Sequence, residues 1–171
     1  MKKLKVAACF AMLGALVMMV PVKAKADTPS DDDKKFLAMA AQSDVNEIQL
    51  SQLAVQKATN PAVKAFAEKM VKEHKQLSAS MKPFAEEWGL TPPTGLDDDH
   101  QKEYDKLNGL SGADFDKEYI SQMVTDHANA LDAFTKEAKD TKDLKFRAAV
   151  IKGKTVVAAH KNMAYDLKKK L

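Results

Sequence analysis

The chain has 171 residues, of which 45% are hydrophobic, and it carries one cysteine and a formal net charge of +3. Five of its 27 basic residues lie in the first 26 positions, so the remainder holds 22 basic against 24 acidic residues. This balance excludes the basic surface that nucleic-acid binding requires, and the remaining length, about 145 residues, is enough for one domain with a sizeable core.

The first 26 residues have the pattern of a cleavable signal peptide. A lysine-rich start precedes an uncharged, mostly apolar run of 15 residues, Val6 to Val20, and Ala24-Lys25-Ala26 supplies the small residues that a signal peptidase requires. The run is shorter than the roughly 20 residues of a membrane-spanning helix, although a retained anchor is the alternative. We therefore predict cleavage near Ala26 and a mature domain of residues 27–171 without cysteine or transmembrane segment, periplasmic or secreted.

Apolar residues then recur at helical spacing in four long segments, and no segment alternates as a strand would. These helices are expected to begin near Asp31, Pro61, Ser111 and Thr141. A polar connector of 23 residues, 89 to 111, separates the second helix from the third, with a short helix around His100 to Leu107. The connector permits a crossover of the ferritin kind, although a loop between adjacent helix ends would fit equally well. We predict an all-α, four-helix bundle.

One sequence pattern recurs in the last three long helices: Met or Val, then Val, two free positions and His. It occurs at Met70–His74, Met123–His127 and Val156–His160. Each histidine continues the apolar stripe of its helix, so we expect the three imidazoles to point into the interior. On the first helix, Glu47 lies in a register that is otherwise small or apolar, and a competing register through Asp44 is almost as good.

Distance from the nearest turn indicates which of these groups can meet. At about 1.5 Å of rise per residue, Glu47 and His74 differ in height by only about 3 Å, whereas His160 lies roughly 6 Å off the level of His127. We predict a tentative metal site of Glu47, His74, His127 and His160, in which His160 fits least well. Imidazole and carboxylate suit one Zn, Fe, Cu or Ni ion. The alternative is a hydrogen-bonded His/Glu core without metal, in a non-enzymatic interaction or structural protein of the periplasm.

The carboxylates near the histidines do not fit an oxygen-activating dimetal centre. Such centres use Glu-x-x-His on two helices, and the positions three before each histidine are here Val71, Val124 and Val157. Glu73 and Asp126 each precede a histidine by one residue, which turns them about 100° round the helix. We expect them at the surface or bonded to the ligands from outside. No catalytic residue is predicted, and a role in metal handling or envelope stress is favoured over an enzymatic one; the protein partner and the oligomeric state stay open.

Three parts of the chain match a known protein family. They are the segment AQSDVNE at 41–47, the segment NPAVKAFAEKMVKEH at 60–74, and the histidines at 127 and 160. Together they resemble the DUF4142 family, exported bacterial proteins of unknown function that are placed with the ferritin-like superfamily. The resemblance covers about residues 33–167 and implies a ferritin-like bundle, but it implies no activity. Family members usually have Asp where this chain has Glu73.

Overall fold

The computed structural model describes residues 28–171, which form five α-helices and no strand. The helices are α1 (Asp31–Lys57), α2 (Pro61–Trp88), α3 (Asp98–Gly109), α4 (Gly112–Asp140) and α5 (Leu144–Lys168). The prediction of an all-helical chain is therefore confirmed. The predicted signal peptide, residues 1–26, lies outside the described residues. None of the helices within 28–171 has the length and apolar character needed to cross a membrane.

Side-chain caps fix where the helices begin. Ser30 and Asp33 form the predicted capping box before α1, with Ser30 Oγ accepting from the Asp33 amide at 3.0 Å and Asp33 Oδ2 accepting from the Ser30 amide at 2.8 Å. Asp97 accepts from the first amides of α3, and Asp143 does the same for α5. These aspartates explain why α3 begins before His100 and why α5 begins at Leu144 rather than at the predicted Thr141.

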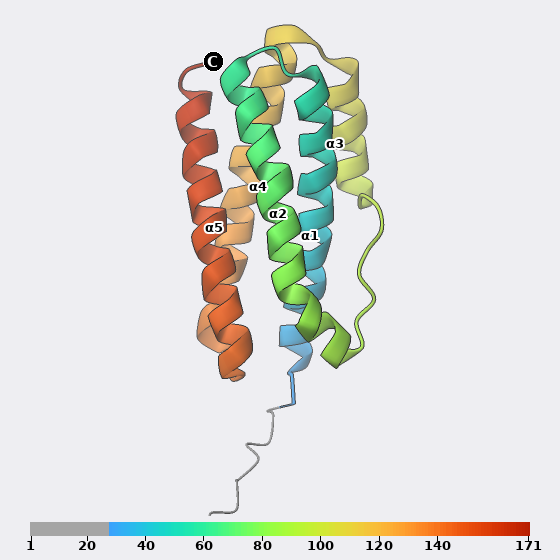
Figure 1. Ribbon diagram of the computed structural model, residues 1–171, viewed down its shortest axis with the longest axis vertical. Helices are drawn as coiled ribbons and strands as arrows, with labels where there is room; N and C mark the ends of the chain where they lie inside the picture. Colours follow the sequence, from blue (N-terminus) through green and yellow to red (C-terminus); the bar gives the residue numbers. More distant parts are fainter. Residues whose placement is uncertain (1–27) are drawn as a thin grey trace, which may run out of the picture.

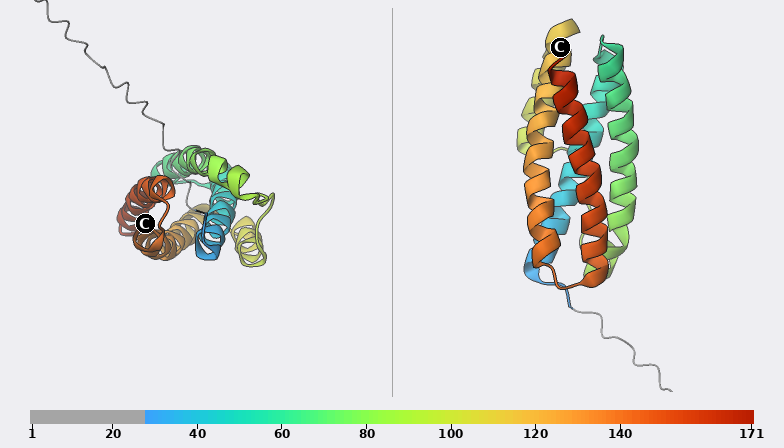
Figure 2. Two further views of the ribbon diagram at one scale, coloured as in Figure 1. Left: turned by 90° about the horizontal axis from the view of Figure 1, so that it is seen from below. Right: turned by 90° about the vertical axis from the view of Figure 1, so that its left-hand side faces the viewer.

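The four long helices lie side by side, and neighbouring helices run in opposite directions (Figures 1 and 2). α1 packs against α2 and α4, and α5 packs against α4 and α2. The connector after α2 returns along the outside of the molecule, where α3 lies against α1 and α4 (Figure 1). Because of this return, α2 and α4 run in the same direction and lie diagonally across the interior.

The core consists of two apolar clusters separated by a polar layer. One cluster, at the end with the α1–α2 turn, includes Leu50, Phe66, Met70, Tyr119 and Met123. The other, at the opposite end, includes Phe36, Met81, Phe134, Phe146 and Val157. Between them lie the buried polar side chains of Asp44, Glu47, His74, His127 and His160. The apolar clusters close this layer at both ends, so its polar groups interact mainly with one another.

Candidate metal centre

Three histidines from three helices meet in the polar layer. The ring centroids of His74, His127 and His160 form a nearly equilateral triangle with sides of 5.5, 5.3 and 5.2 Å. Each ring offers one nitrogen, and these three nitrogens all lie within 4.8 Å of one another. The three residues are 3%, 1% and 0% exposed, respectively. The structure thus places all three imidazoles inside the molecule and close together.

One nitrogen of each ring is bonded to an acceptor outside the cluster. His127 Nδ1 donates to the carbonyl oxygen of Met123 at 2.8 Å, His74 Nδ1 lies 2.8 Å from Asp44 Oδ1, and His160 Nε2 lies 2.7 Å from Glu73 Oε2. A carbonyl or a carboxylate only accepts, so these partners assign the ring protons to the bonded nitrogens. When a ring is neutral, its other nitrogen, Nε2 of His74 or His127 and Nδ1 of His160, carries the lone pair.

Two of these lone pairs face each other. His74 Nε2 and His127 Nε2 are 3.4 Å apart, and His160 Nδ1 is buried with no hydrogen-bond partner among residues 28–171. Burial, together with the charges of the other two histidines, lowers the pKa of His127 to about 3. Burial also lowers the pKa of His160 to about 4. Since these two rings stay neutral near pH 7, the arrangement suits a metal cation, which imidazole ligands bind through such lone pairs while the other ring nitrogen is hydrogen-bonded.

Glu47, the predicted fourth ligand, lies next to the cluster without belonging to the three-nitrogen group. Its Oε1 is 3.8 Å from His127 Nδ1, which is the nitrogen bonded to Met123. Its Oε2 is buried and has no hydrogen-bond partner in the part of the chain that the structure describes. Burial, and then the charges of Asp126 and Asp44, raise the pKa of Glu47 well above its usual range. Burial thus disfavours the charged form of Glu47, and its Oε2 is available to accept or to ligate.

The two carboxylates predicted to lie outside the ligands have different surroundings. Glu73 precedes His74 in sequence but bonds to His160 on α5, and it also pairs with Lys69. Asp126 accepts from Gln122 and lies between the cluster and α3. Of these two carboxylates, only Glu73 bonds directly to a ring of the cluster.

Asp44 has a role that the sequence reasoning did not assign. Its Oδ1 holds His74 Nδ1, and its Oδ2 accepts from Ser78 Oγ at 2.9 Å. The sequence feature that could have revealed this role is the spacing of Asp44 from Glu47. Residues three apart share a face of a helix, so both side chains point inward at this height.

The expected height mismatch of His160 is smaller in the structure and does not keep its ring away from the other two. The turn between α4 and α5 occupies residues 141–143, so His127 and His160 lie 13 and 16 residues from the helix ends that flank it. The difference in height is then only about 4.5 Å, which the imidazole side chains span. The sequence prediction began the last helix near Thr141, three residues before its observed start at Leu144.

Comparison with known proteins now identifies the family. The sequence pattern of DUF4142, a domain of unknown function, matches residues 19–167. The chain belongs to the DUF4142 family. This confirms the family predicted from the sequence. The search of curated proteins gave no match to this DUF4142 chain.

Solved structures share the fold of this DUF4142 protein. A DUF305 fragment from Deinococcus radiodurans superposes with a TM-score of 0.70 at 11% identity, covering 84% of this chain and 99% of that one. CopM in its Cu(I)-bound form gives a TM-score of 0.68 at 21% identity, covering 81% of this chain and 96% of that one. CopM in its Ag-bound form gives 0.67 at 21% identity with the same coverage. At these identities the similarity concerns the fold alone.

Proposed function

We propose that this DUF4142 protein binds one transition-metal ion between His74, His127 and His160. The observation that carries the proposal is the meeting of three buried imidazoles, each of which has one nitrogen within 4.8 Å of one nitrogen of the other two, with Nε2 of His74 and Nε2 of His127 only 3.4 Å apart. When both rings are neutral and no cation is bound, the facing Nε2 lone pairs of His74 and His127 repel each other in surroundings of low polarity. An ion between the three imidazoles would replace that repulsion by three metal–nitrogen bonds.

The groups around the rings support the same proposal. Asp44 and Glu73 hold the outer nitrogens of His74 and His160, which keeps each ring in the tautomer that a metal requires. Two carboxylates at this position also offset the charge of a divalent ion. Glu47 Oε2, which is buried and unpartnered among residues 28–171, is the available fourth group.

The chemistry of the nitrogen ligands selects a class of ion. Imidazole nitrogen suits Zn, Cu, Fe and Ni, and the absence of thiolates in residues 27–171 leaves nitrogen and oxygen as the main donors. Zinc is the first candidate because three histidines with one further position form a common zinc site. Copper is the second candidate because CopM, which shares the fold, has been solved with Cu(I) bound.

The proposal extends to the setting of the site. Residues 1–26 would direct export, and residues 27–171 would form a ferritin-like four-helix bundle of α1, α2, α4 and α5 in the periplasm or outside the cell. The ion would serve metal handling or envelope stress rather than catalysis. The positions three before each histidine are valines, and the histidines are closed off from solvent, which both argue against an oxygen-activating dimetal enzyme.

Metal analysis of protein purified without a histidine tag tests the proposal. Metal-free protein is incubated with Zn²⁺ or Cu²⁺, desalted, and analysed for bound metal and for melting temperature. We expect one ion per chain and a higher melting temperature, because an ion that binds only the folded state stabilises it. His127→Ala should lose the ion. The control Tyr119→Phe, which removes a buried hydrogen bond to Ser51 outside the polar layer, should keep it.

The opposite result would favour the alternative function. If Zn, Fe, Cu and Ni all fail to bind stoichiometrically and none raises the melting temperature, the metal proposal is wrong. The histidines would then be a hydrogen-bonded structural core in an interaction protein, and His74→Ala and His127→Ala would lower stability while sparing function.

A further inference from the structure

The closed position of the three histidines raises the question of how an ion reaches them. A small internal cavity of about 10 Å³, room for about one water molecule, borders Glu47, His74 and His127. On the surface between α1, α3 and α4 lies a pocket of about 300 Å³, which we name the α3 pocket. Ser43, Asp126 and Ala130 line both the internal cavity and the α3 pocket. These three side chains therefore lie between the α3 pocket and the internal cavity.

Polar atoms suited to a cation lie along this path. At the α3 pocket, His100 Nδ1 lies 2.8 Å from Asp97 Oδ1 and 3.0 Å from Asn46 Nδ2, and the tautomer with its proton on Nδ1 has its lone pair on Nε2. That nitrogen lies 4.0 Å from Asp126 Oδ2. A tetrahedral ion with bonds of about 2 Å needs its ligand atoms about 3.3 Å apart, so a side-chain shift of about 0.7 Å would let His100 and Asp126 share one ion. Further in, the unpartnered Oε2 of the buried Glu47 provides the next oxygen before the histidines.

The other surface pockets are less suited to admit a cation to the histidines. A groove of about 450 Å³ between α2 and α5 shares only the apolar Leu77 with the internal cavity, and Lys145 and Lys152 line it. Its carboxylate, Glu73, is already bonded to His160 and Lys69. Lysines at the opening would repel a cation, and no free ligand leads inward from it.

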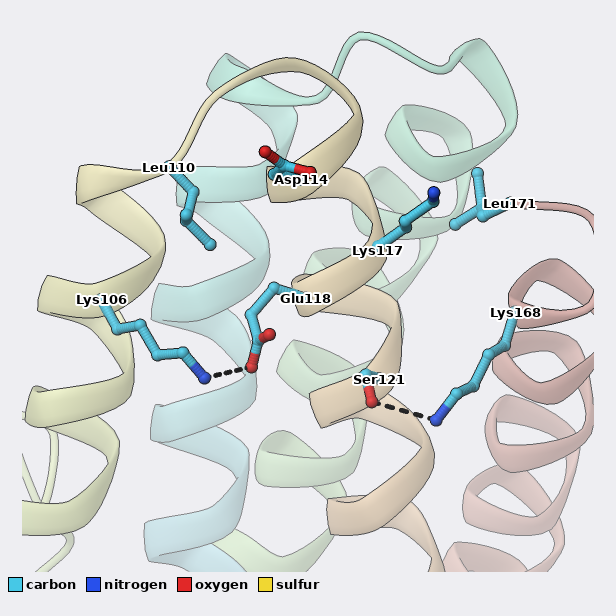
Figure 3. A pocket seen from close by; sticks show the side chains of 8 residues that line it. All are labelled: Lys106, Leu110, Asp114, Lys117, Glu118, Ser121, Lys168 and Leu171. Carbon is cyan, nitrogen blue, oxygen red and sulfur yellow. Dashed lines mark hydrogen bonds and ion pairs between the residues drawn. The ribbon is translucent and has the colours of Figure 1, made fainter.

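Two further pockets are also unsuited to admit a cation, one because of its composition and the other because of its position. The pocket of about 230 Å³ between α1 and α2 is mainly apolar, and its link to the cavity is Asp44, both of whose oxygens are bonded. The pocket of about 520 Å³ near the C-terminus is lined by Lys106, Lys117 and Lys168 and shares no lining residue with the internal cavity (Figure 3). The α3 pocket is the one whose walls and ligands both lead to the histidines.

We propose that the α3 pocket is where a transition-metal ion enters the protein, and that His100 and Asp126 bind the ion first and pass it inward past Glu47. This inference rests on the proposed function, since it needs a metal site to lead to. It gives the connector helix α3 a function: α3 lies outside the four long helices, against α1 and α4 (Figures 1 and 2). His100 on this helix lines the pocket. His100, which no apolar stripe explains, becomes the outer ligand of the path.

Rates of metal uptake and release, measured by stopped flow against a chromophoric chelator, test the path. The probe is the ion that binds stoichiometrically at equilibrium, Zn²⁺ or Cu²⁺. Met39→Trp places a bulky ring at the opening, where Met39 is 39% exposed. It should slow uptake and release by the same factor and leave the Kd unchanged, because a blocked path changes rates and not the site. Lys152→Trp, on the α2–α5 groove, is the matched control and should keep the native rates.

A second pair of variants tests the ligands of the path rather than its width. Asp126→Asn removes a carboxylate that attracts the ion and should slow uptake about tenfold, the lower end of the effect of charge in a cleft. His100→Ala removes the neighbouring nitrogen ligand and should also slow uptake. Glu118→Gln removes a carboxylate from the pocket in Figure 3, where it pairs with Lys106, and should leave uptake unchanged.

The outcomes separate the two proposals. If the native protein binds one ion but Met39→Trp takes it up at the native rate, or if Lys152→Trp is the slower variant, the path is wrong and the metal site stands. The same conclusion follows if Asp126→Asn and Glu118→Gln slow uptake equally. If no ion binds at equilibrium, both the site and the path are refuted.

Discussion

The substitution Asp44→Asn tests whether the outer hydrogen bonds of the histidines matter for metal binding. Asp44 is 6% exposed and joins His74 Nδ1 to Ser78 Oγ. Asparagine keeps the size of the side chain but removes its charge. The ring of His74 then loses the carboxylate that makes Nε2 a better donor and that offsets the charge of the ion. Removing such a partner costs about 10- to 100-fold in metal affinity, or about 1.4 to 2.7 kcal/mol.

Competition with a chromophoric chelator at pH 7 measures this loss of affinity. Asp116→Asn is the matched control. Asp116 is equally enclosed, at 2% exposed, but it accepts from the backbone amides of Thr59 and Asn60 at the α1–α2 turn, away from the imidazoles. The control should lose about 1–3 kcal/mol of unfolding free energy and keep the native metal affinity. Native affinity in Asp44→Asn, or an equal loss in both variants, would refute the reasoning from the outer hydrogen bonds.

Three further predictions concern the metal-free protein and can be checked by urea unfolding. Stability should fall as the pH drops from 6.5 towards 4, because burial lowers the pKa of His127 to about 3 and the unfolded chain takes up the proton first; His127→Gln should reduce this slope, and an unchanged slope would contradict it. Burial and the neighbouring Asp33 raise the pKa of Glu137 from 4.5 to about 7, so its contribution has the opposite sign. Stability is lost as the pH rises from 4.5 to 7, by up to about 3 kcal/mol, and Glu137→Gln should remove this loss. Gly153→Ala would place a Cβ 2.5 Å from the ring of the buried Phe134. It should cost about 1–3 kcal/mol, more than the gain in helix propensity, and native stability would count against the clash.

Much of the fold follows from local sequence rules. The capping box at Ser30, the first-turn proline Pro61 and the apolar stripes fix the helix starts and the faces that turn inward. Periodicity also predicted that His74, His127 and His160 would share the interior. What these rules describe is the angular position of a residue on its own helix, and that is enough to find the histidines.

The partners across helices could not be predicted in the same way. Glu73 lies about 100° round the helix from His74, and whether that direction leads to solvent or to another helix depends on how the helices are arranged. Because α5 lies on that side of α2, Glu73 bonds to His160. The bond of Asp116 to the turn before α2 likewise depends on which helix ends come together. The direction of the connector, which the sequence left open, determines both arrangements.

The proposed metal ligands come from two helical hairpins, which links metal binding to the association of these hairpins. The α4–α5 hairpin carries His127 and His160, whereas the α1–α2 hairpin carries His74 together with Asp44 and Glu47. Neither hairpin alone holds a complete ligand set, so an ion bound at the proposed site would bridge the two halves of the chain. By thermodynamic reciprocity, the ion strengthens the association of the hairpins by the same factor by which their association strengthens ion affinity. A protein cut within the connector would then reassemble more tightly when the metal is supplied.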